Sequence, residues 1–182
     1  MDALERLLRE RSVSLGSFVL ASGQVSSYYI DARKTTMSAE GLRLIGRLSL
    51  RAIRAAGWEP VAVGGLTLGA DPVAYAIAAA SLESPPIING FCVRKARKEH
   101  GTQQPIEGNF KAGDPVVVVE DVITSGGSAL QAIAAVRAEG GDVLGVLAVV
   151  DREQGGGAKI ESNGFRVISL TTTRRLGLDP SA

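Results

Sequence analysis

The sequence lacks most of the features that mark secreted, membrane-spanning or nucleic-acid-binding proteins. Its 182 residues include one cysteine, Cys92, so no disulfide can form within the chain, which favours a reducing compartment. No apolar run approaches the roughly 20 residues that a membrane span needs, and the N-terminal segment MDALERLLRER is too charged for a signal peptide. A formal net charge of +1 gives no overall attraction to nucleic acid or to an anionic membrane. We therefore expect a cytoplasmic protein with neither of these partners.

Aromatic residues are also scarce. They make up 4% of the chain, against 45% for hydrophobic residues as a whole, so the core must consist mainly of Val, Ile, Leu and Ala, as in α/β proteins. The length suffices for one domain with a real core and is short of two, so we expect residues 1–182 to form a single domain. The 22 glycines and 21% charged residues are compatible with a loop-rich globular enzyme and give no sign of disorder.

Apolar runs alternate with helical patterns through most of the chain. We expect five strands, at residues 60–65, 86–93, 115–121, 143–151 and 165–170, with helices at 71–82 and 128–140. Before them we expect a short helix, a strand pair around the turn at Ser22-Gly23, and a helix capped by Ser38, and we expect Asp71 to cap the helix at 71–82. Strands that are apolar on both faces indicate a mostly parallel sheet covered by helices on both sides. Ligand contacts are then expected just after residues 65, 93, 121 and 151.

The third expected strand ends in two acids followed by hydroxyls and glycines, in VVVVEDVITSGGSAL (116–130). Unpaired N–H groups at a helix N-terminus carry partial positive charge, so the segment TSGGS (124–128) is suited to hold a phosphate. Glu120 and Asp121 would repel a phosphate beside them, and they suit the hydroxyls of a sugar or a hydrated Mg²⁺. Together these features describe a site for a ribose 5-phosphate. The alternative, a capped helix after a core strand, leaves the two adjacent acids unexplained.

This segment resembles the phosphoribosyl pyrophosphate (PRPP) binding motif of type I phosphoribosyltransferases, which is an apolar strand, two acids, two apolar or small residues and a Thr/Ser/Gly loop. The resemblance implies the type I phosphoribosyltransferase fold, an α/β fold whose mostly parallel five-stranded sheet is flanked by helices. It also implies that PRPP contacts a continuous run of residues, namely Glu120, Asp121, Val122, Ile123, Thr124, Ser125, Gly126, Gly127 and Ser128.

A basic segment, RKARKEHG (94–101), follows the second expected strand. A solvated charged loop is the usual explanation for such a run. Here the segment begins where a strand ends, and a loop that closes cations onto a leaving pyrophosphate would stabilise charge as it develops and exclude water. Its candidate residues for that task are Arg94, Lys95, Lys98 and His100.

The same segment is similar to the catalytic loop of orotate phosphoribosyltransferases, the pyrimidine-synthesis group of this family. Three further segments resemble parts of that group in the same order along the chain: FVLASGQVSSYYID its N-terminal strand pair that covers the base, GGLTLGADP (64–72) its pyrophosphate-side loop, and Asp151-Arg152 the position of its orotate-contacting arginine. The resemblance extends over roughly residues 13 to 153. It implies a small strand-containing hood over the base site, contributed by about residues 13–36.

The resemblance implies transfer of the 5-phosphoribosyl group from PRPP to N1 of orotate, giving orotidine 5′-phosphate and pyrophosphate in de novo UMP synthesis. Lys98 and His100 would neutralise the departing pyrophosphate, with Arg94 and Lys95 helping to bind it, and Asp121 would lie near the reacting centre. Mg²⁺ is the implied cofactor, carried mainly by PRPP and close to the acid pair. A homodimer whose catalytic loop reaches the partner's site is implied as well.

Orotate is a planar anion, which an arginine and an aromatic ring can bind together. The expected contacts are Arg152 at its polar edge, Tyr28 or Tyr29 against the ring, and Thr124. The alternatives are ordinary strand packing for the tyrosines and a surface salt bridge for Arg152.

Two positions depart from the family pattern, and two other functions share part of it. Ala21 and Gly69 stand where many members of the family have a lysine, so this chain lacks both cations. A phosphoribosyltransferase for another base, such as a purine, would share the PRPP loop but not RKxxKxHG together with SSYYID and Asp151-Arg152. A PRPP-sensing regulator that has lost catalysis would need a DNA-binding domain or an extended basic face to act on nucleic acid, and the sequence indicates neither.

Overall fold

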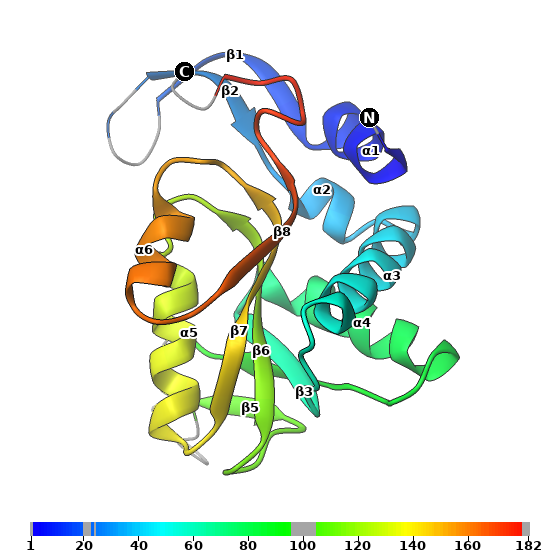
Figure 1. Cartoon of the computed structure of the whole chain (residues 1–182). Helices are drawn as coiled ribbons and strands as arrows, with labels where there is room; N and C mark the ends of the chain where they lie inside the picture. The colour runs from blue at the N-terminus through cyan, green and yellow to red at the C-terminus, as the bar shows by residue number, and fades with distance from the viewer. Residues whose placement is uncertain (1, 20–22, 24, 96–104, 180–182) are drawn as a thin grey trace.

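The structure, a computed structural model, describes residues 2–19, 23, 25–95 and 105–179 (Figure 1). Within this part, the main sheet has six strands in the order β5-β4-β3-β6-β7-β8. These strands are β3 (Ala62–Leu66), β4 (Asn89–Val93), β5 (Ile106–Gly108), β6 (Pro115–Ile123), β7 (Asp142–Asp151) and β8 (Val167–Thr172). All neighbours in the sheet are parallel except β4 and β5. The mostly parallel sheet expected from the sequence is confirmed.

Helices cover both faces of this sheet, with α3 and α4 on one face and α5 and α6 on the other (Figure 1). The helices are α1 (Ala3–Arg11), α2 (Arg33–Thr36), α3 (Ala39–Ala55), α4 (Ala70–Glu83), α5 (Gly127–Ala138) and α6 (Gly156–Ser162). Side chains along β6 point alternately to the two faces of the sheet. Val117 and Val119 belong to the core under α3 and α4, while Val116 and Val118 belong to the core under α5. All four valines are fully buried. The apolar run in the sequence is thus a strand buried on two sides.

The sixth strand, β5, was not predicted. Its three residues are too few to show a periodic pattern, and it pairs antiparallel with β4 at the edge of the sheet, with Ile106 opposite Val93. The N–H of Arg94 donates to the carbonyl of Pro105 at 2.9 Å. Arg94, the first residue of the basic segment, is therefore held next to Pro105 at the sheet edge.

The expected N-terminal strand pair is confirmed as an antiparallel pair of β1 (Val13–Val19) and β2 (Val25–Ile30). It lies beyond the carboxyl ends of the main strands (Figure 1). Phe18 and Tyr29 pack across the pair, with ring centroids 5.8 Å apart.

One of the two helix caps named from the sequence is confirmed and the other is wrong. Ser38 caps α3, where its Oγ accepts a hydrogen bond from the N–H of Gly41 at 3.1 Å. The N-cap of α4 is Gly69 rather than Asp71, since the backbone at Gly69 is already helical, and Asp71 lies in the first turn. The segment after β3 thus enters its helix earlier than the Asp-Pro pattern suggested.

Candidate active site

A cavity of about 330 Å³ opens where the carboxyl ends of the strands meet the N-terminal strand pair. It is lined by residues 29–33, residues 66–69, Lys95, residues 120–122, Thr124, Ser128 and Arg152. The segments that follow β3, β4, β6 and β7 all contribute to it. The places where the sequence led us to expect ligand contacts therefore surround one cavity.

The loop between β6 and α5 presents an uncapped helix N-terminus beside this cavity. A smaller hollow of about 100 Å³ is lined by Glu120 and residues 122–129. Gly126, the N-cap of α5, has a positive φ of 75° and makes no side-chain cap hydrogen bond. A Cβ on Gly126 would lie 2.8 Å from the carbonyl oxygen of Gly156, so this position requires glycine. The first N–H groups of α5 lack a side-chain cap, and such an end is suited to bind an anion.

The acid pair predicted to hold the ribose lies at the end of β6. Glu120 is 5% exposed, and its Oε1 has no hydrogen-bond partner among the described residues. Burial, together with the charge of Asp121, raises the pKa of Glu120 to about 8, against the opposing effect of Lys95. Burial also raises the pKa of Asp121, although the N–H of Val122 donates to its Oδ1 at 2.8 Å. Two carboxyls that are costly to ionise thus face the same cavity.

Gly69 stands directly against this pair. A Cβ on Gly69 would lie 2.7 Å from Oδ1 of Asp121, so any side chain at this position would displace the carboxylate. A lysine here, which many family members have, would therefore need the Asp121 carboxylate to move. Ala21, the other position without the expected lysine, is outside the described residues.

Arg152 directly follows β7, and its side chain is buried. It is 7% exposed, and its Nε and one terminal nitrogen have no hydrogen-bond partner among the described residues. Its guanidinium lies over the Tyr28 ring, 5.1 Å from the ring centroid, and makes a cation–π contact with it. Because a buried arginine without an acceptor is costly, a bound anion is the natural partner for these N–H groups. The alternative of a surface salt bridge for Arg152 is wrong.

The two tyrosines of β2 face opposite ways. Tyr28 is 1% exposed, does not line the cavity, and keeps a buried hydroxyl without a partner in the described part of the chain. Tyr29 is 41% exposed and lines the cavity. Strand packing, the alternative raised from the sequence, is thus the observed arrangement for Tyr28, and Tyr29 is the tyrosine that lines the cavity.

The basic segment is described only at its start. Arg94 forms an ion pair with Glu107 at 2.5 Å and does not line the cavity, whereas Lys95 does. Lys98 and His100, the expected catalytic residues of this segment, lie outside the described residues.

Sequence reasoning missed one charged pair in the cavity wall. Asp31 and Arg33, just after β2, both line the cavity and bond to each other, with Nε of Arg33 donating to Oδ1 of Asp31 at 2.8 Å. The Asp-x-Arg spacing is a weak signal by itself, since such local pairs are common on protein surfaces.

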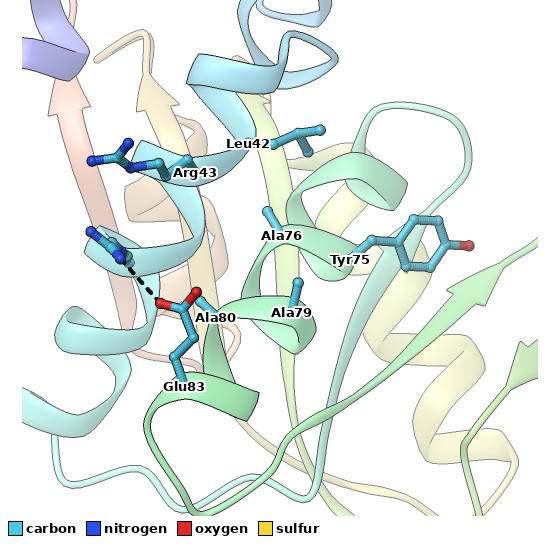
Figure 2. A pocket seen from close by; sticks show the side chains of 8 residues that line it. Leu42, Arg43, Tyr75, Ala76, Ala79, Ala80 and Glu83 are labelled. Carbon is cyan, nitrogen blue, oxygen red and sulfur yellow. Dashed lines mark hydrogen bonds and ion pairs between the residues drawn. The ribbon is translucent and has the colours of Figure 1, made fainter.

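A second hollow, of about 320 Å³, lies between α3 and α4 and contains none of the predicted site residues (Figure 2). Small alanines of α4 form its floor, and the ion pair of Arg47 with Glu83 at 3.1 Å spans the two helices. Tyr75 projects from α4 at the edge of the hollow and is 53% exposed. This is a surface between helices and separate from the cavity at the strand ends.

Neither a metal cage nor a membrane-spanning helix occurs in the part of the chain that the structure describes. No group of three or more His, Cys, Asp or Glu residues is placed there to hold a metal ion. No described helix has both the length and the apolar character that crossing a bilayer demands.

Comparison with known proteins places this geometry in a family. Residues 34–172 match the family described as phosphoribosyl transferase domain. The orotate phosphoribosyltransferase of Aquifex aeolicus is 46% identical over 172 residues, which are 93% of each chain. The structure of Mycobacterium tuberculosis H37Rv orotate phosphoribosyltransferase in complex with Fe(III) dicitrate is similar with a TM-score of 0.86 and 46% identity, over 96% of this chain and 97% of that one. Its complex with PRPP gives a TM-score of 0.82 and 42% identity over 96% and 97%. The chain belongs to the phosphoribosyltransferase family, among its orotate phosphoribosyltransferases.

Proposed function

We propose that this chain transfers the 5-phosphoribosyl group from PRPP to N1 of orotate, releasing pyrophosphate and forming orotidine 5′-phosphate for pyrimidine synthesis. One observation carries the proposal: an open helix N-terminus, the buried Glu120 beside the half-buried Asp121, and a buried arginine without an acceptor among the described residues meet in one cavity. The first suits a phosphate, the second the hydroxyls of a ribose, and the third a planar anion. PRPP and orotate together present all three chemistries.

The roles of the residues follow from charge. When the bond between ribose C1 and pyrophosphate breaks, positive charge builds on the ribose and negative charge on the leaving group, as in glycosyl transfer. Asp121 lies where it would face the ribose ring, and residues 124–128 would hold the 5-phosphate. Lys95, with Lys98 and His100, would neutralise the pyrophosphate. Arg94 is already paired with Glu107. We therefore expect it to act by positioning the start of the basic segment.

Orotate would bind between Arg152 and the N-terminal strand pair. The unpaired N–H groups of Arg152 would donate to the carboxylate edge of orotate, and Tyr29 would flank the ring, with Thr124 alongside. Tyr28 would hold Arg152 in place from beneath. As N1 of orotate bonds to C1 of the ribose, the N1 proton is released.

The acid pair also fits Mg²⁺ that arrives with the substrate. Glu120 and Asp121 are hard oxygen donors at the cavity wall, and Oε1 of Glu120 lacks a partner among the described residues. Mg²⁺ bound to PRPP would neutralise charge on the diphosphate. We therefore propose that the metal is carried mainly by PRPP, with these two carboxylates close to it.

We further propose that the chain acts as a homodimer with shared active sites, in the cytoplasm. The single cysteine supports the reducing compartment. For the contact between copies, the hollow between α3 and α4 is the most suitable surface, because Tyr75 is exposed beside it (Figure 2). Tyr75 also reaches β4, since a Cβ on Gly90 would lie 3.2 Å from its ring. Because β4 leads into the basic segment, a partner held here would lie near the start of that loop.

Turnover of orotate tests the proposal. The protein is incubated with PRPP, Mg²⁺ and either orotate or adenine, and the loss of orotate absorbance and the release of pyrophosphate are followed. We expect turnover with orotate and none with adenine. Turnover with adenine alone would favour a purine enzyme, and binding of PRPP without turnover of either base would favour a regulator.

A further inference from the structure

The cations available to a diphosphate in this cavity are few. Among the described residues, Arg33, Lys95 and Arg152 are the lysines and arginines that line it. Arg152 is buried beside Tyr28, where we place orotate, and Lys95 belongs to the basic segment. Since position 69 is a glycine and carries no charge, a further fixed cation has to come from another segment. Arg33 is the candidate that remains.

Arg33 is held in a fixed orientation by Asp31. Its Nε donates to Oδ1 of Asp31 at 2.8 Å and one terminal nitrogen donates to Oδ2 at 3.2 Å, while its backbone N–H donates to the same Oδ1 at 3.3 Å. The guanidinium has five N–H groups, so this forked pair leaves others without a partner among the described residues. Asp31 is anchored in turn, since its N–H donates to the carbonyl of Ser12 at 2.9 Å. The guanidinium is thus positioned before any ligand arrives.

The position of Arg33 relative to Asp121 defines which part of the ligand it faces. Arg33 and Asp121 line the same cavity, and the charge of Arg33 is among the effects that oppose the rise in the pKa of Asp121 caused by burial. Asp121 lies against Gly69, at the loop after β3. The 5-phosphate and orotate are already placed at residues 124–128 and at Arg152. The part of the cavity lined by Arg33 and residues 66–69 is left for the diphosphate, and the Mg²⁺ carried by PRPP would screen it from the carboxylate of Asp121.

We propose that Arg33, oriented by Asp31, is a fixed binding residue for the diphosphate of PRPP and supplies a cation that this chain lacks at positions 21 and 69. The inference rests on the proposed function, because it takes PRPP as the ligand. An arginine is required here, since one guanidinium bonds Asp31 and phosphate oxygens at the same time, whereas the ammonium of a lysine is a single point of charge. The pre-formed pair also reduces the side-chain entropy lost on binding.

The role of Arg33 can be tested with two fragments of PRPP, pyrophosphate and ribose 5-phosphate. Titration calorimetry measures the affinity of the full chain for pyrophosphate with Mg²⁺ and, separately, for ribose 5-phosphate. For Arg33→Gln we expect the Kd of pyrophosphate to rise by about tenfold or more, as for a lost charged hydrogen bond, with the Kd of ribose 5-phosphate within about twofold of wild type. Arg11→Gln, which removes an exposed arginine that is paired with Glu40 and does not line the cavity, should change neither. A pyrophosphate Kd unchanged in Arg33→Gln, or an equal loss for both ligands, would overturn the proposal.

The variant Asp31→Asn tests whether Asp31 orients Arg33 or affects binding only through its own charge. Asp31→Asn removes a negative charge from the cavity wall, so charge alone predicts tighter binding of pyrophosphate. If Asp31 orients Arg33, binding weakens instead, by about threefold or more. Tighter binding would contradict the role of Asp31. Arg33→Lys should fall between wild type and Arg33→Gln, which keeps the test valid if the glutamine variant does not fold.

The two proposals fail in different ways. If the wild-type chain binds pyrophosphate but does not turn over orotate, the proposed function fails while the role of Arg33 can still be measured. If the wild-type chain turns over orotate and Arg33→Gln keeps both the pyrophosphate Kd and the KM of PRPP, the role of Arg33 fails alone.

Discussion

At the scale of single residues, Glu120 couples the site to pH. The folded protein holds a proton on this carboxyl up to about pH 8, whereas the ordinary pKa of a glutamate is 4.5. Between these two values the native state binds more protons than the unfolded state, so this group lowers stability as pH rises through that window. The burial of Glu120 at the place where Mg²⁺–PRPP would bind thus lowers the stability of the ligand-free protein.

Replacing Glu120 by glutamine should remove this cost. At pH 5, where the carboxyl is protonated in the folded state, we expect the unfolding free energy of Glu120→Gln to be close to that of wild type. At pH 9 we expect the variant to be more stable by about 2–3 kcal/mol, because one pKa unit corresponds to about 1.4 kcal/mol and buried sites relax partly. Urea unfolding at the two pH values measures this, and an equal difference at both would contradict the account.

Tyr28 gives a second prediction at this scale, because its ring and its hydroxyl have separate roles. Tyr28→Leu removes the ring beneath Arg152, so we expect the KM of orotate to rise by about tenfold, as expected for a lost desolvated cation–π contact. Tyr28→Phe removes a hydroxyl that has no partner among the described residues, so KM should stay within about twofold and stability should hold or rise. Steady-state kinetics with varied orotate distinguish the two. Equal losses in both variants would indicate that the hydroxyl contacts the substrate.

The sequence could name both tyrosines but could not choose between them. Adjacent residues of a strand face opposite sides, so either Tyr28 or Tyr29 had to point at the ligand. The choice depends on how β2 sits over the main sheet, which is a long-range arrangement. The same holds for Arg33, which lines the same cavity as Asp121 although about 90 residues separate them in the chain. Motif reasoning recovers local patterns and misses partners of this kind.

At the scale of elements, the loop from β6 to α5 gives a further prediction. Gly126 and Gly155 both have positive φ, but a Cβ on Gly126 would meet the carbonyl of Gly156 at 2.8 Å, whereas a Cβ on Gly155 would meet nothing within 4 Å. Both alanine variants should lose about 1 kcal/mol of stability from backbone strain. Only Gly126→Ala should also shift the loop and raise the Kd of ribose 5-phosphate, by about tenfold or more, as calorimetry would show. Similar affinities in the two variants would mean that this loop does not hold the phosphate.

Elements with a clear local sequence pattern were predicted well, whereas the edge strand β5 and the start of α4 were not. The apolar runs of β6 and β7 and the Ser38 cap of α3 carry strong local signals, and all three are confirmed. The edge strand β5 has three residues and is defined by pairing with β4. The start of α4 was misplaced because Asp71 and Pro72 give a cap pattern, whereas the backbone is already helical at Gly69.

At the scale of the whole molecule, the shared active site of a dimer gives a test in mixed chains. Lys98→Ala and Asp121→Asn should each be inactive alone. If the basic loop serves the partner's cavity, a mixed dimer has one complete site, so random mixing should restore about a quarter of wild-type activity, since half of the dimers are mixed. Refolded or co-expressed mixtures assayed for orotate turnover measure this. No recovery in a mixture whose mixed dimers are verified would argue that each loop serves its own cavity.

The position of the bound sugar donor tests the whole account most directly. In a crystal structure with PRPP and Mg²⁺, we expect the 5-phosphate within about 3 Å of the N–H groups of residues 125–128, the ribose hydroxyls at Glu120 and Asp121, and the diphosphate beside residues 66–69 and Arg33. PRPP bound at another place, with the loop at residues 124–128 free of phosphate, would contradict it.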